Sequence, residues 1–133
     1  MHRPPFPSPL ADCRRLFLRN HEVKIYIGAH DFEQVAAQRV LINVDLYVPL
    51  AQTTPVNDQL GEVVDYDFVR EVIRERVARG HIQLQETLAD DLLALLLAHP
   101  QVRAVRVSTE KPDVYPDCDA VGVEVFAFKP APA

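Results

Sequence analysis

The sequence has few of the residues that build metal sites or disulfide frameworks. Its two cysteines, Cys13 and Cys118, do not form a CxxC pair, and its five histidines are scattered without an HExxH pattern. Metal-binding motifs place cysteine and histidine ligands at close, regular spacing. We therefore predict no metal site and no disulfide framework.

Long apolar runs and secretion signals are lacking as well. No uninterrupted apolar run approaches the ~20 residues that a helix needs to cross a membrane. The N-terminus, MHRPPFPSPLAD, contains four prolines in its first ten residues and no apolar core of the kind found in secretory signals. We therefore predict no membrane partner and a reduced, cytoplasmic location.

An excess of positive charge is also missing, since the formal net charge is −5. Nucleic-acid-binding proteins normally carry a basic patch or stripe. The densest basic cluster alternates with acids: Arg70, Glu71, Arg74, Glu75, Arg76 and Arg79. This spacing is typical of an ion-paired helix face. We therefore predict no nucleic-acid partner. The sequence also lacks a glycine-rich phosphate loop and a GxSxG motif, so we predict none of the common phosphate-loop or serine-hydrolase chemistries.

The length of 133 residues suits one domain. Six of the eleven prolines lie close to the two chain ends. Proline-rich ends of this kind are typically extended and mobile. We therefore predict a flexible extension over residues 1–12, a single folded domain over residues 13–129 and a short tail over residues 130–133.

Apolar residues alternate along four segments and recur at helical spacing along two others. The expected strands are residues 16–28, 39–48, 102–110 and 120–128. The expected helices are residues 66–79 and 85–98, and Asp65 lies where the first of them would have its N-cap. The order β-β-α-α-β-β predicts an α+β fold, with a four-stranded antiparallel sheet and two helices on one face. Such a sheet has two exposed edges, which joining edge to edge into a ring would cover.

Several single polar residues lie where they could take part in chemistry. Glu33 follows the first expected strand and Gln38 opens the second; taken alone, each is most often a solvated side chain. Tyr66 opens the first helix, where a phenol is most often amphipathic, although a phenol near a reacting atom can transfer a proton. These three residues are candidates only in combination with others.

Glu86 lies in the first turn of the second expected helix. The helix dipole alone favours a carboxylate there. The residue three positions earlier is Gln83 and not Ser or Thr, so a capping box does not explain it. A carboxylate beside free backbone N–H groups could bind the edge of a heterocycle that carries an amidine-like N–H/NH₂ pair and a carbonyl.

Lys111 stands between Glu110 and Pro112 at the end of the third expected strand. Successive side chains of an extended chain point to opposite faces, so Lys111 and Glu110 should not pair. Pro112 keeps Lys111 in an extended conformation and thereby fixes the direction of its side chain. A surface charge and a catalytic base are both consistent with these features.

Five segments together resemble the dihydroneopterin aldolase family of folate biosynthesis. They occur in the family's order and cover about residues 14–128. The segments are IGAHDFEQ (27–34), QRVLINVDL (38–46), NDQLGEVVDY (57–66), LQETLADDL (84–92) and EKPDVYPDCDAVGVEV (110–125). The resemblance implies the tunnelling fold, built as a homotetramer or homo-octamer with active sites at subunit interfaces, a small-molecule pterin substrate and no cofactor.

The resemblance also implies a role for each candidate. Glu86, with the backbone around Gln85, matches the pterin anchor, and Glu33 matches a loop glutamate near the substrate side chain. Gln38 matches a residue that orients water or substrate. Lys111 matches the catalytic lysine, and Tyr66 matches a tyrosine that reaches the site across a subunit boundary and helps proton transfer.

The implied reaction is the cleavage of 7,8-dihydroneopterin into 6-hydroxymethyl-7,8-dihydropterin and glycolaldehyde. Two alternatives remain open. One is an epimerase acting at C2′ of dihydroneopterin or its triphosphate, which residues 28–38 and 110–120 disfavour because acids outnumber bases there. The other is a non-catalytic pterin-binding protein of the same fold, which would be expected to have lost the lysine or the tyrosine.

Overall fold

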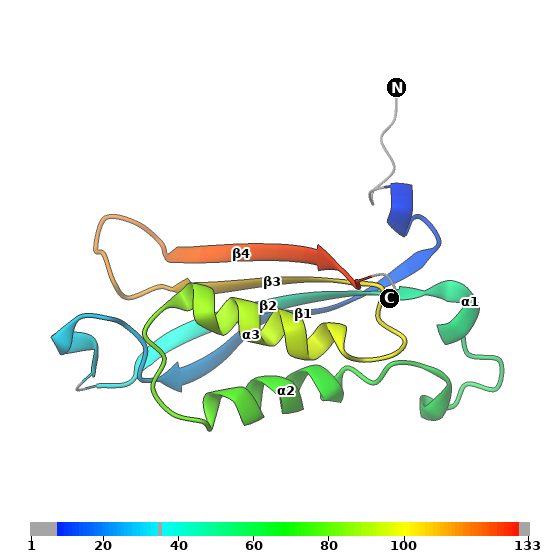
Figure 1. Cartoon of the computed structure of the whole chain (residues 1–133), viewed down its shortest axis with the longest axis horizontal. Helices are drawn as coiled ribbons and strands as arrows, with labels where there is room; N and C mark the ends of the chain where they lie inside the picture. Colours follow the sequence, from blue (N-terminus) through cyan, green and yellow to red (C-terminus); the bar gives the residue numbers. More distant parts are fainter. Residues whose placement is uncertain (1–7, 35, 131–133) are drawn as a thin grey trace.

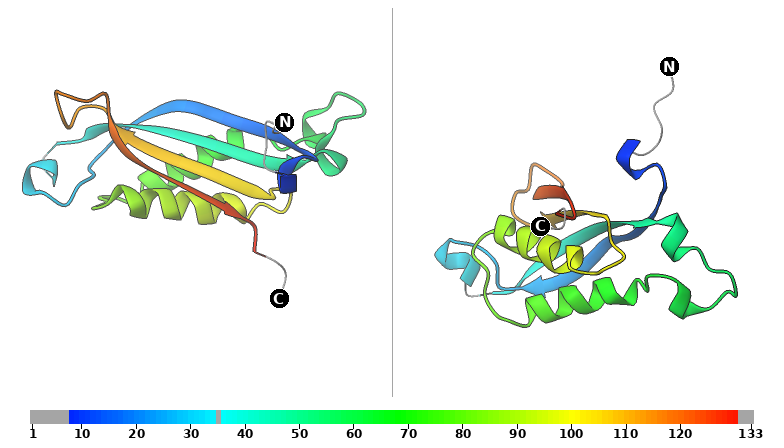
Figure 2. Two further views of the ribbon diagram at one scale, coloured as in Figure 1. Left: turned by 90° about the horizontal axis from the view of Figure 1, so that it is seen from above. Right: turned by 45° about the vertical axis from the view of Figure 1, so that its right-hand side comes forward.

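Four strands form one antiparallel sheet in the order β1-β2-β3-β4, and two helices cover one of its faces (Figures 1 and 2). The computed structural model describes residues 8–34 and 36–130. The strands are β1 (Cys13–Ile25), β2 (Gln38–Pro49), β3 (Ala104–Lys111) and β4 (Val121–Phe128), and the main helices are α2 (Asp67–Val77) and α3 (Gln85–Leu97). The short elements are η1 (Ser8–Leu10), η2 (Asp31–Gln34), α1 (Leu50–Thr53) and η3 (Leu60–Glu62). The predicted α+β fold is confirmed.

The core lies between the sheet and the two helices. Alternate residues of β2, from Val40 to Val48, are buried on the helix side because a strand turns every second side chain to the same face. Leu88, Leu92 and Leu96 of α3 recur at helical spacing and pack into the same cluster. The two helices run antiparallel (Figure 1), and Arg76 Nε of α2 donates to Asp91 Oδ2 of α3 at 2.8 Å.

The start of α2 follows the expected capping chemistry. Asp65 Oδ1 accepts a hydrogen bond from the backbone N–H of Asp67 at 2.9 Å. This bond satisfies one of the amides that the first turn of a helix leaves without a partner. The last turn is followed by Gly80, whose φ of +111° suits glycine. The N-terminal signal at Asp65 was therefore correct, whereas the helix ends at Val77, two residues before the predicted end.

The folded unit begins before residue 13, inside the segment 1–12 that was predicted to be a flexible extension. Leu10, within η1, has no exposed surface and packs against Cys13, Tyr47 and Ala104 at one end of the sheet. Residues 8–12 therefore belong to the folded unit, because a leucine at this position completes a second apolar cluster beside the main core. The rest of the predicted extension, residues 1–7, and residues 131–133 of the predicted tail lie outside the described residues.

The sheet face away from the helices is mixed in character. Asp45 accepts a hydrogen bond from Arg15 at 2.9 Å, and Arg106 Nη1 lies 3.8 Å from its second oxygen. Phe17 is stacked between Arg15 and Arg19. Within the described ranges, no helix is long and apolar enough to cross a membrane, and no cluster of His, Cys, Asp and Glu could hold a metal ion.

Candidate active site

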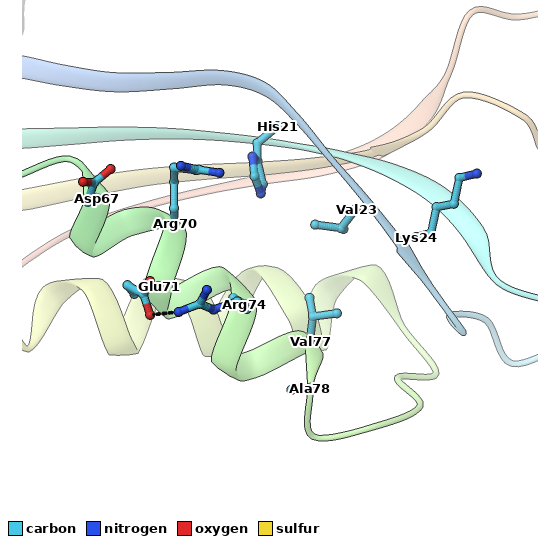
Figure 3. Close-up of a pocket in the computed structure, with 9 residues that line it drawn as sticks. All are labelled: His21, Val23, Lys24, Asp67, Arg70, Glu71, Arg74, Val77 and Ala78. Atoms are coloured by element: carbon cyan, nitrogen blue, oxygen red, sulfur yellow. Dashed lines mark hydrogen bonds and ion pairs between the residues drawn. The ribbon is translucent and has the colours of Figure 1, made fainter.

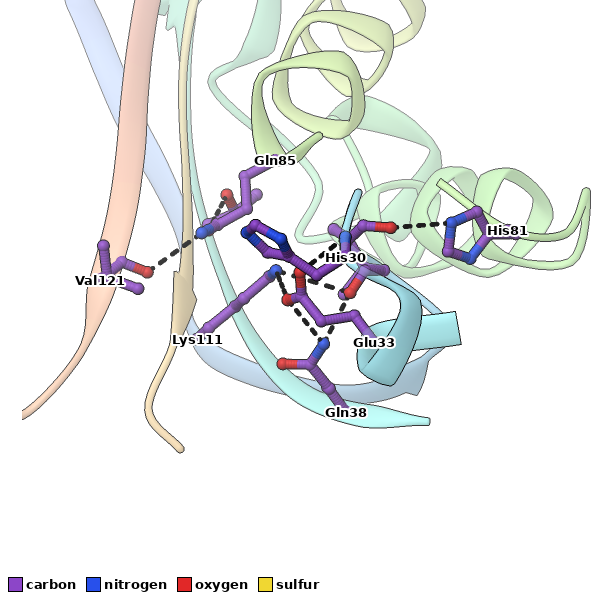
Figure 4. Close-up of polar contacts among 10 residues, drawn as sticks. His30, Glu33, Gln38, His81, Gln85, Lys111 and Val121 are labelled. Atoms are coloured by element: carbon purple, nitrogen blue, oxygen red, sulfur yellow. Dashed lines mark hydrogen bonds and ion pairs between the residues drawn. The ribbon is translucent and has the colours of Figure 1, made fainter. Parts of the chain in front are cut away.

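A buried ion pair joins the end of β3 to the loop after β1. Lys111 Nζ donates to Glu33 Oε2 at 2.7 Å, and only 7% of Lys111 and 6% of Glu33 is exposed (Figure 4). Lys111 points away from Glu110, as the alternation of the strand predicts. Buried charges persist in proteins when they are paired and hydrogen-bonded. The pair therefore fixes the position of one ammonium group at one end of the sheet.

Gln38, the first residue of β2, completes the polar network around this pair. Its Nε2 donates to the backbone oxygen of Ile27 at 2.6 Å and to Glu33 Oε2 at 3.0 Å. Lys111 Nζ also approaches the Ile27 oxygen, at 3.5 Å. Glu33 Oε2 thus accepts from both the amide and the ammonium group. The structure thus brings Lys111 to Glu33 and Gln38, although Lys111 is 78 residues from Glu33 along the chain.

The network holds the carboxyl group of Glu33 in its charged form. The hydrogen bond from Lys111 lowers the pKa of Glu33 most, burial opposes it, and the amide of Gln38 lowers it further. The result is a pKa of about 2, against an ordinary value of 4.5. Glu33 is therefore an anion throughout the physiological pH range, and it orients Lys111 as a permanent acceptor.

Gly28 allows the loop to bring Glu33 this close. Its φ is +137°, and a Cβ at this position would lie 2.1 Å from Cδ of Glu33. The backbone N–H of Gly28 donates to the oxygen of Ile82 at 2.9 Å, and His81 Nε2 lies 3.0 Å from the Gly28 oxygen. The glycine therefore pins the loop to the segment before α3 and leaves room for the carboxylate.

A cavity of about 290 Å³ opens beside the ion pair. Its wall combines the loop after β1, the start of α3, the end of β3 and the β3–β4 connection. The lining residues are His30, Glu33, Gln85, Lys111, Val114, Tyr115 and Val121. This volume is close to the lower limit of ~300 Å³ for small-molecule sites. The cavity is therefore of the size expected for part of a ligand site.

Gln85 ties the first turn of α3 to the sheet. Its side-chain oxygen accepts from Thr109 Oγ1 at 2.9 Å, and its Nε2 donates to the Val121 oxygen at 3.2 Å. The N-terminal end of α3 is thus held against β3 and β4. Glu86 is the next residue; it is exposed, and it does not line the cavity. Among the described contacts, no hydrogen bond or ion pair engages its carboxylate, and no side chain caps this helix.

Tyr66 lies apart from the other candidates within one chain. It precedes α2, is 56% exposed and does not line the cavity. The two helices are antiparallel, and α3 starts close to where α2 ends (Figure 1). With 11 residues, α2 places Tyr66 about 16 Å along its axis from that end. One copy of the chain therefore holds Glu33, Gln38 and Lys111 together, but it does not add the phenol.

Besides the valines Val114 and Val121, three residues with polar groups at the site were not predicted individually. His30 and Tyr115 line the cavity, and the hydroxyl of Thr109 holds Gln85. The first two fall inside segments that carried the family resemblance, and Tyr115 stands out as a 55% exposed aromatic side chain. Thr109 is fully buried in β3. The only sequence signal for its role was a hydroxyl group at a strand position that usually carries an apolar core residue.

Comparison with known proteins identifies the family. The family model for dihydroneopterin aldolase, FolB, matches residues 16–126. The chain belongs to the dihydroneopterin aldolase family. It is accordingly an enzyme of the lyase class.

The relatives of known structure or name include aldolases and one epimerase. The crystal structure of a dihydroneopterin aldolase from Burkholderia thailandensis bound to guanine is 67% identical, with a TM-score of 0.86 over 92% of this chain and 97% of that one. A dihydroneopterin aldolase from Streptococcus pyogenes is 33% identical over 75% of this chain and 86% of its own length. A dihydroneopterin triphosphate 2′-epimerase from Pseudomonas aeruginosa is 26% identical over 86% of this chain and 93% of its own length.

Proposed function

We propose that this chain cleaves 7,8-dihydroneopterin into 6-hydroxymethyl-7,8-dihydropterin and glycolaldehyde, as a step of folate biosynthesis in the cytoplasm. The observation that carries the proposal is the buried Lys111–Glu33 pair at the wall of the cavity. A lysine side chain held at a fixed point beside a cavity can take a proton from a bound ligand as the neutral amine and return it as the ammonium group. Family membership identifies the ligand class as a pterin.

The chemistry of the substrate explains why these residue types suffice. Removal of the 2′-hydroxyl proton allows the C1′–C2′ bond to break, and its electron pair moves into the C6=N5 imine of the ring. Glycolaldehyde leaves, and protonation at C1′ of the resulting enamine gives the product. The ring itself accepts the electrons, so neither a lysine Schiff base nor a Lewis-acid metal is required. The proton lost at oxygen balances the proton gained at carbon.

Lys111 is the proton-transfer group that one chain provides on its own. Glu33 holds the ammonium group of Lys111 in place, and Gln38 holds Glu33. Glu33 and Gln38 are therefore positioning residues, and they are also candidates for contact with the substrate side chain. Tyr66 is the second proton-transfer group. Because Tyr66 lies away from the cavity of its own chain, we assign it to the site of a neighbouring subunit.

The first turn of α3 is the proposed pterin anchor. Glu86 offers two acceptor oxygens, and the uncapped amides around Gln85 offer donors. The pyrimidine edge of a pterin presents N–H, NH₂ and carbonyl groups in a row. Guanine, which the Burkholderia relative binds, presents the same row. A carboxylate beside helix N-terminal amides complements that edge with two charge-assisted hydrogen bonds.

The two free sheet edges support the proposed assembly into a ring. Within the described part of the chain, β1 and β4 each pair with one neighbour only. Pairing β4 of one copy with β1 of the next would continue the antiparallel order and would cover both edges. We therefore propose a homotetramer or homo-octamer whose sites each combine Lys111 of one subunit with Tyr66 of the next.

The 2′-epimerase remains the second candidate, because the relative from Pseudomonas aeruginosa carries that name. Readdition of glycolaldehyde through its other face would invert C2′ with the same residues. Incubation of the purified protein with 7,8-dihydroneopterin, without added metal, followed by chromatography of the products, separates the two. Glycolaldehyde release supports the aldolase; a C2′ epimer without glycolaldehyde replaces it with the epimerase.

Two variants test the roles. Lys111→Ala should abolish glycolaldehyde release and leave pterin binding nearly unchanged, whereas Glu86→Ala should mainly weaken pterin binding. Binding is measured by titration, and thermal melting of each variant confirms that it is folded. If Lys111→Ala loses binding and activity equally while still folded, Lys111 is an anchor and not a proton-transfer group. If Glu86→Ala binds pterin like the unmodified protein, the anchor lies elsewhere.

A further inference from the structure

One ionisable residue at the cavity beside the Lys111–Glu33 pair has no part in the proposed reaction. His30 lies in the loop after β1 and lines this cavity together with Lys111 and Gln85. Figure 4 shows its ring turned from the loop toward these two side chains. The residue is also exposed. A histidine in this position can exchange protons both with a ligand in the cavity and with water.

The proposed cleavage begins with the removal of the 2′-hydroxyl proton, and this step needs a base. Glu33 is a poor one, because a carboxylate with a pKa of about 2 is very weakly basic. Lys111 donates to that carboxylate, which favours its ammonium form, and an ammonium group has no lone pair to accept a proton. Tyr115, and the Tyr66 that we assign to a neighbouring subunit, are phenols, which ordinarily keep their proton up to about pH 10. None of these four groups is a strong base at neutral pH.

The surroundings of His30 suit a base. Imidazoles change charge between about pH 5 and pH 8, so a neutral ring that accepts protons is available at neutral pH. The charged groups that line the cavity with His30 are Glu33 of its own loop and Lys111 of β3, and they form an ion pair with each other. The start of α3 contributes the amide of Gln85, and the β3–β4 connection contributes the phenol of Tyr115. Among the described residues that line the cavity, His30 is therefore the best proton acceptor.

We propose that His30 is the base that takes the 2′-hydroxyl proton of the bound pterin, and that the ammonium group of Lys111 is the acid. The proposal rests on the proposed function and adds a second proton-transfer group from the same chain. The O–H bond breaks, the C1′–C2′ electron pair moves into the ring imine, and Lys111 gives a proton to C1′ of the enamine. The imidazolium of His30 then passes its proton to the neutral amine of Lys111, directly or through a water molecule. One proton leaves oxygen and one reaches carbon, so each cycle restores both residues.

The ring of His30 can be removed without loosening the ion pair. The described hydrogen bond between His30 and Glu33 comes from the backbone N–H, which donates to Glu33 Oε1 at 3.4 Å. Every residue except proline keeps this donor. Replacement of an exposed side chain usually changes stability little. His30→Gln should therefore remove the base and leave Lys111 and Glu33 in place.

His21 offers a matched control, because it is a half-buried histidine at a different cavity. This cavity has a volume of about 580 Å³ and lies between β1 and α2 (Figure 3). The strand pairing changes from Leu18 opposite Val44 to His21 opposite Ile42, so β1 has one extra residue there. This bulge turns His21 to the helix side of the sheet. His21 does not line the cavity beside Lys111, so His21→Gln should leave the proton transfer intact.

The first experiment measures kcat for 7,8-dihydroneopterin from pH 5 to pH 8 in the unmodified protein, His30→Gln and His21→Gln. In the unmodified protein kcat should fall as the pH decreases, because an imidazolium accepts no proton; Glu33, with its pKa of about 2, stays charged throughout this range. His30→Gln should lose at least about a hundredfold in kcat at pH 8, lose the decline toward low pH, and bind pterin nearly as before. His21→Gln should keep both the rate and its pH dependence. An unchanged rate and pH profile in His30→Gln refutes the base role.

A second variant distinguishes a missing base from a displaced loop. His30→Ala should regain activity when free imidazole is added, because a small base can enter the space that the ring leaves at this exposed position. Lys111→Ala should not respond to imidazole. Thermal melting and pterin titration show whether each variant is folded and binds. A folded, pterin-binding His30→Ala that imidazole does not reactivate would give His30 a structural role and overturn the proposal.

Epimerisation at C2′ keeps the two proposals separable, because it begins with the same loss of the 2′-hydroxyl proton. If the unmodified protein inverts C2′ without releasing glycolaldehyde, the aldolase proposal fails. A hundredfold slower inversion in His30→Gln would still support His30 as the base, whereas equal rates of inversion would refute the base role as well. An unmodified protein that binds pterin but neither cleaves nor inverts 7,8-dihydroneopterin would refute both proposals.

Discussion

Replacement of Glu33 by glutamine tests the ion pair through its pH dependence. The folded-state pKa of Glu33 is about 2, against 4.5 for the ordinary group. Because the pKa is lowered on folding, the carboxylate stabilises the protein above pH 4.5, and this contribution is lost as the pH falls from 4.5 toward 2. The difference between the two pKa values corresponds to an upper limit of about 3 kcal/mol. Since the pair lines a cavity open to water, screening reduces the expected contribution to about 1–2 kcal/mol.

The assay is urea unfolding of the unmodified protein and Glu33→Gln at a series of pH values and one fixed protein concentration. At pH 7 the variant should be less stable by about 1–2 kcal/mol or somewhat more, because Lys111 keeps its burial and loses its anion. The difference should shrink between pH 4.5 and pH 3, where the carboxyl group binds a proton in the unfolded chain but not in the folded one. Protein concentration is held fixed because subunit association contributes to the measured stability.

A matched control separates this effect from general acid destabilisation. Glu75→Gln removes an exposed carboxylate of α2 that forms no described ion pair, so its difference curve should stay flat across the same pH range. A flat curve for Glu33→Gln as well would mean that Glu33 and Lys111 are not paired in solution. The placement of the ammonium group, and the proton-transfer role built on it, would then be refuted.

Two further variants test the scaffold around the site. Gly28→Ala should reduce activity and should lower the free energy of unfolding by about 1–3 kcal/mol for the strained backbone. The reason is that its φ is +137° and its Cβ would collide with Glu33. The control Gly61→Ala, whose Cβ meets nothing within 4 Å, should be neutral in activity assays and in urea unfolding. Leu10→Ala should cost about 2–5 kcal/mol in urea unfolding, whereas Leu60→Ala, at a 65% exposed position, should cost little. A neutral Leu10→Ala would contradict the packing of η1 on the sheet.

Sequence patterns predicted the elements better than their ends. The alternation along β2 and the leucine spacing of α3 each give one apolar face that has to be buried. Both elements, and the α+β order, could therefore be predicted from the sequence. The ordered start at Leu10 did not follow, because prolines around it indicated an extended chain. Its burial depends on a cluster with Tyr47 and Ala104, which are distant in sequence, and local patterns carry no information about such contacts.

The same limit applies to the site. The direction of Lys111 was predictable from strand alternation and Pro112, but its partner was not, because Glu33 is 78 residues away in sequence and reaches it only through the turn at Gly28. The inward direction of His21 was hidden for a similar reason. It depends on a one-residue bulge, and a bulge reverses which side of the strand each later residue faces.

The separation of Tyr66 from Lys111 leads to a test of the shared site that needs two variants in one assembly. Coexpression of Lys111→Ala and Tyr66→Phe subunits produces mixed rings, in which a site is intact only where a Tyr66→Phe subunit supplies the lysine and a Lys111→Ala subunit supplies the phenol. Random mixing in equal amounts gives this arrangement at about a quarter of the interfaces. Glycolaldehyde release should then recover to about a quarter of the activity of the unmodified protein, although each variant alone is nearly inactive. If the phenol acted within its own chain, no mixed ring would contain an intact site, and the activity would equal the average of the two variants.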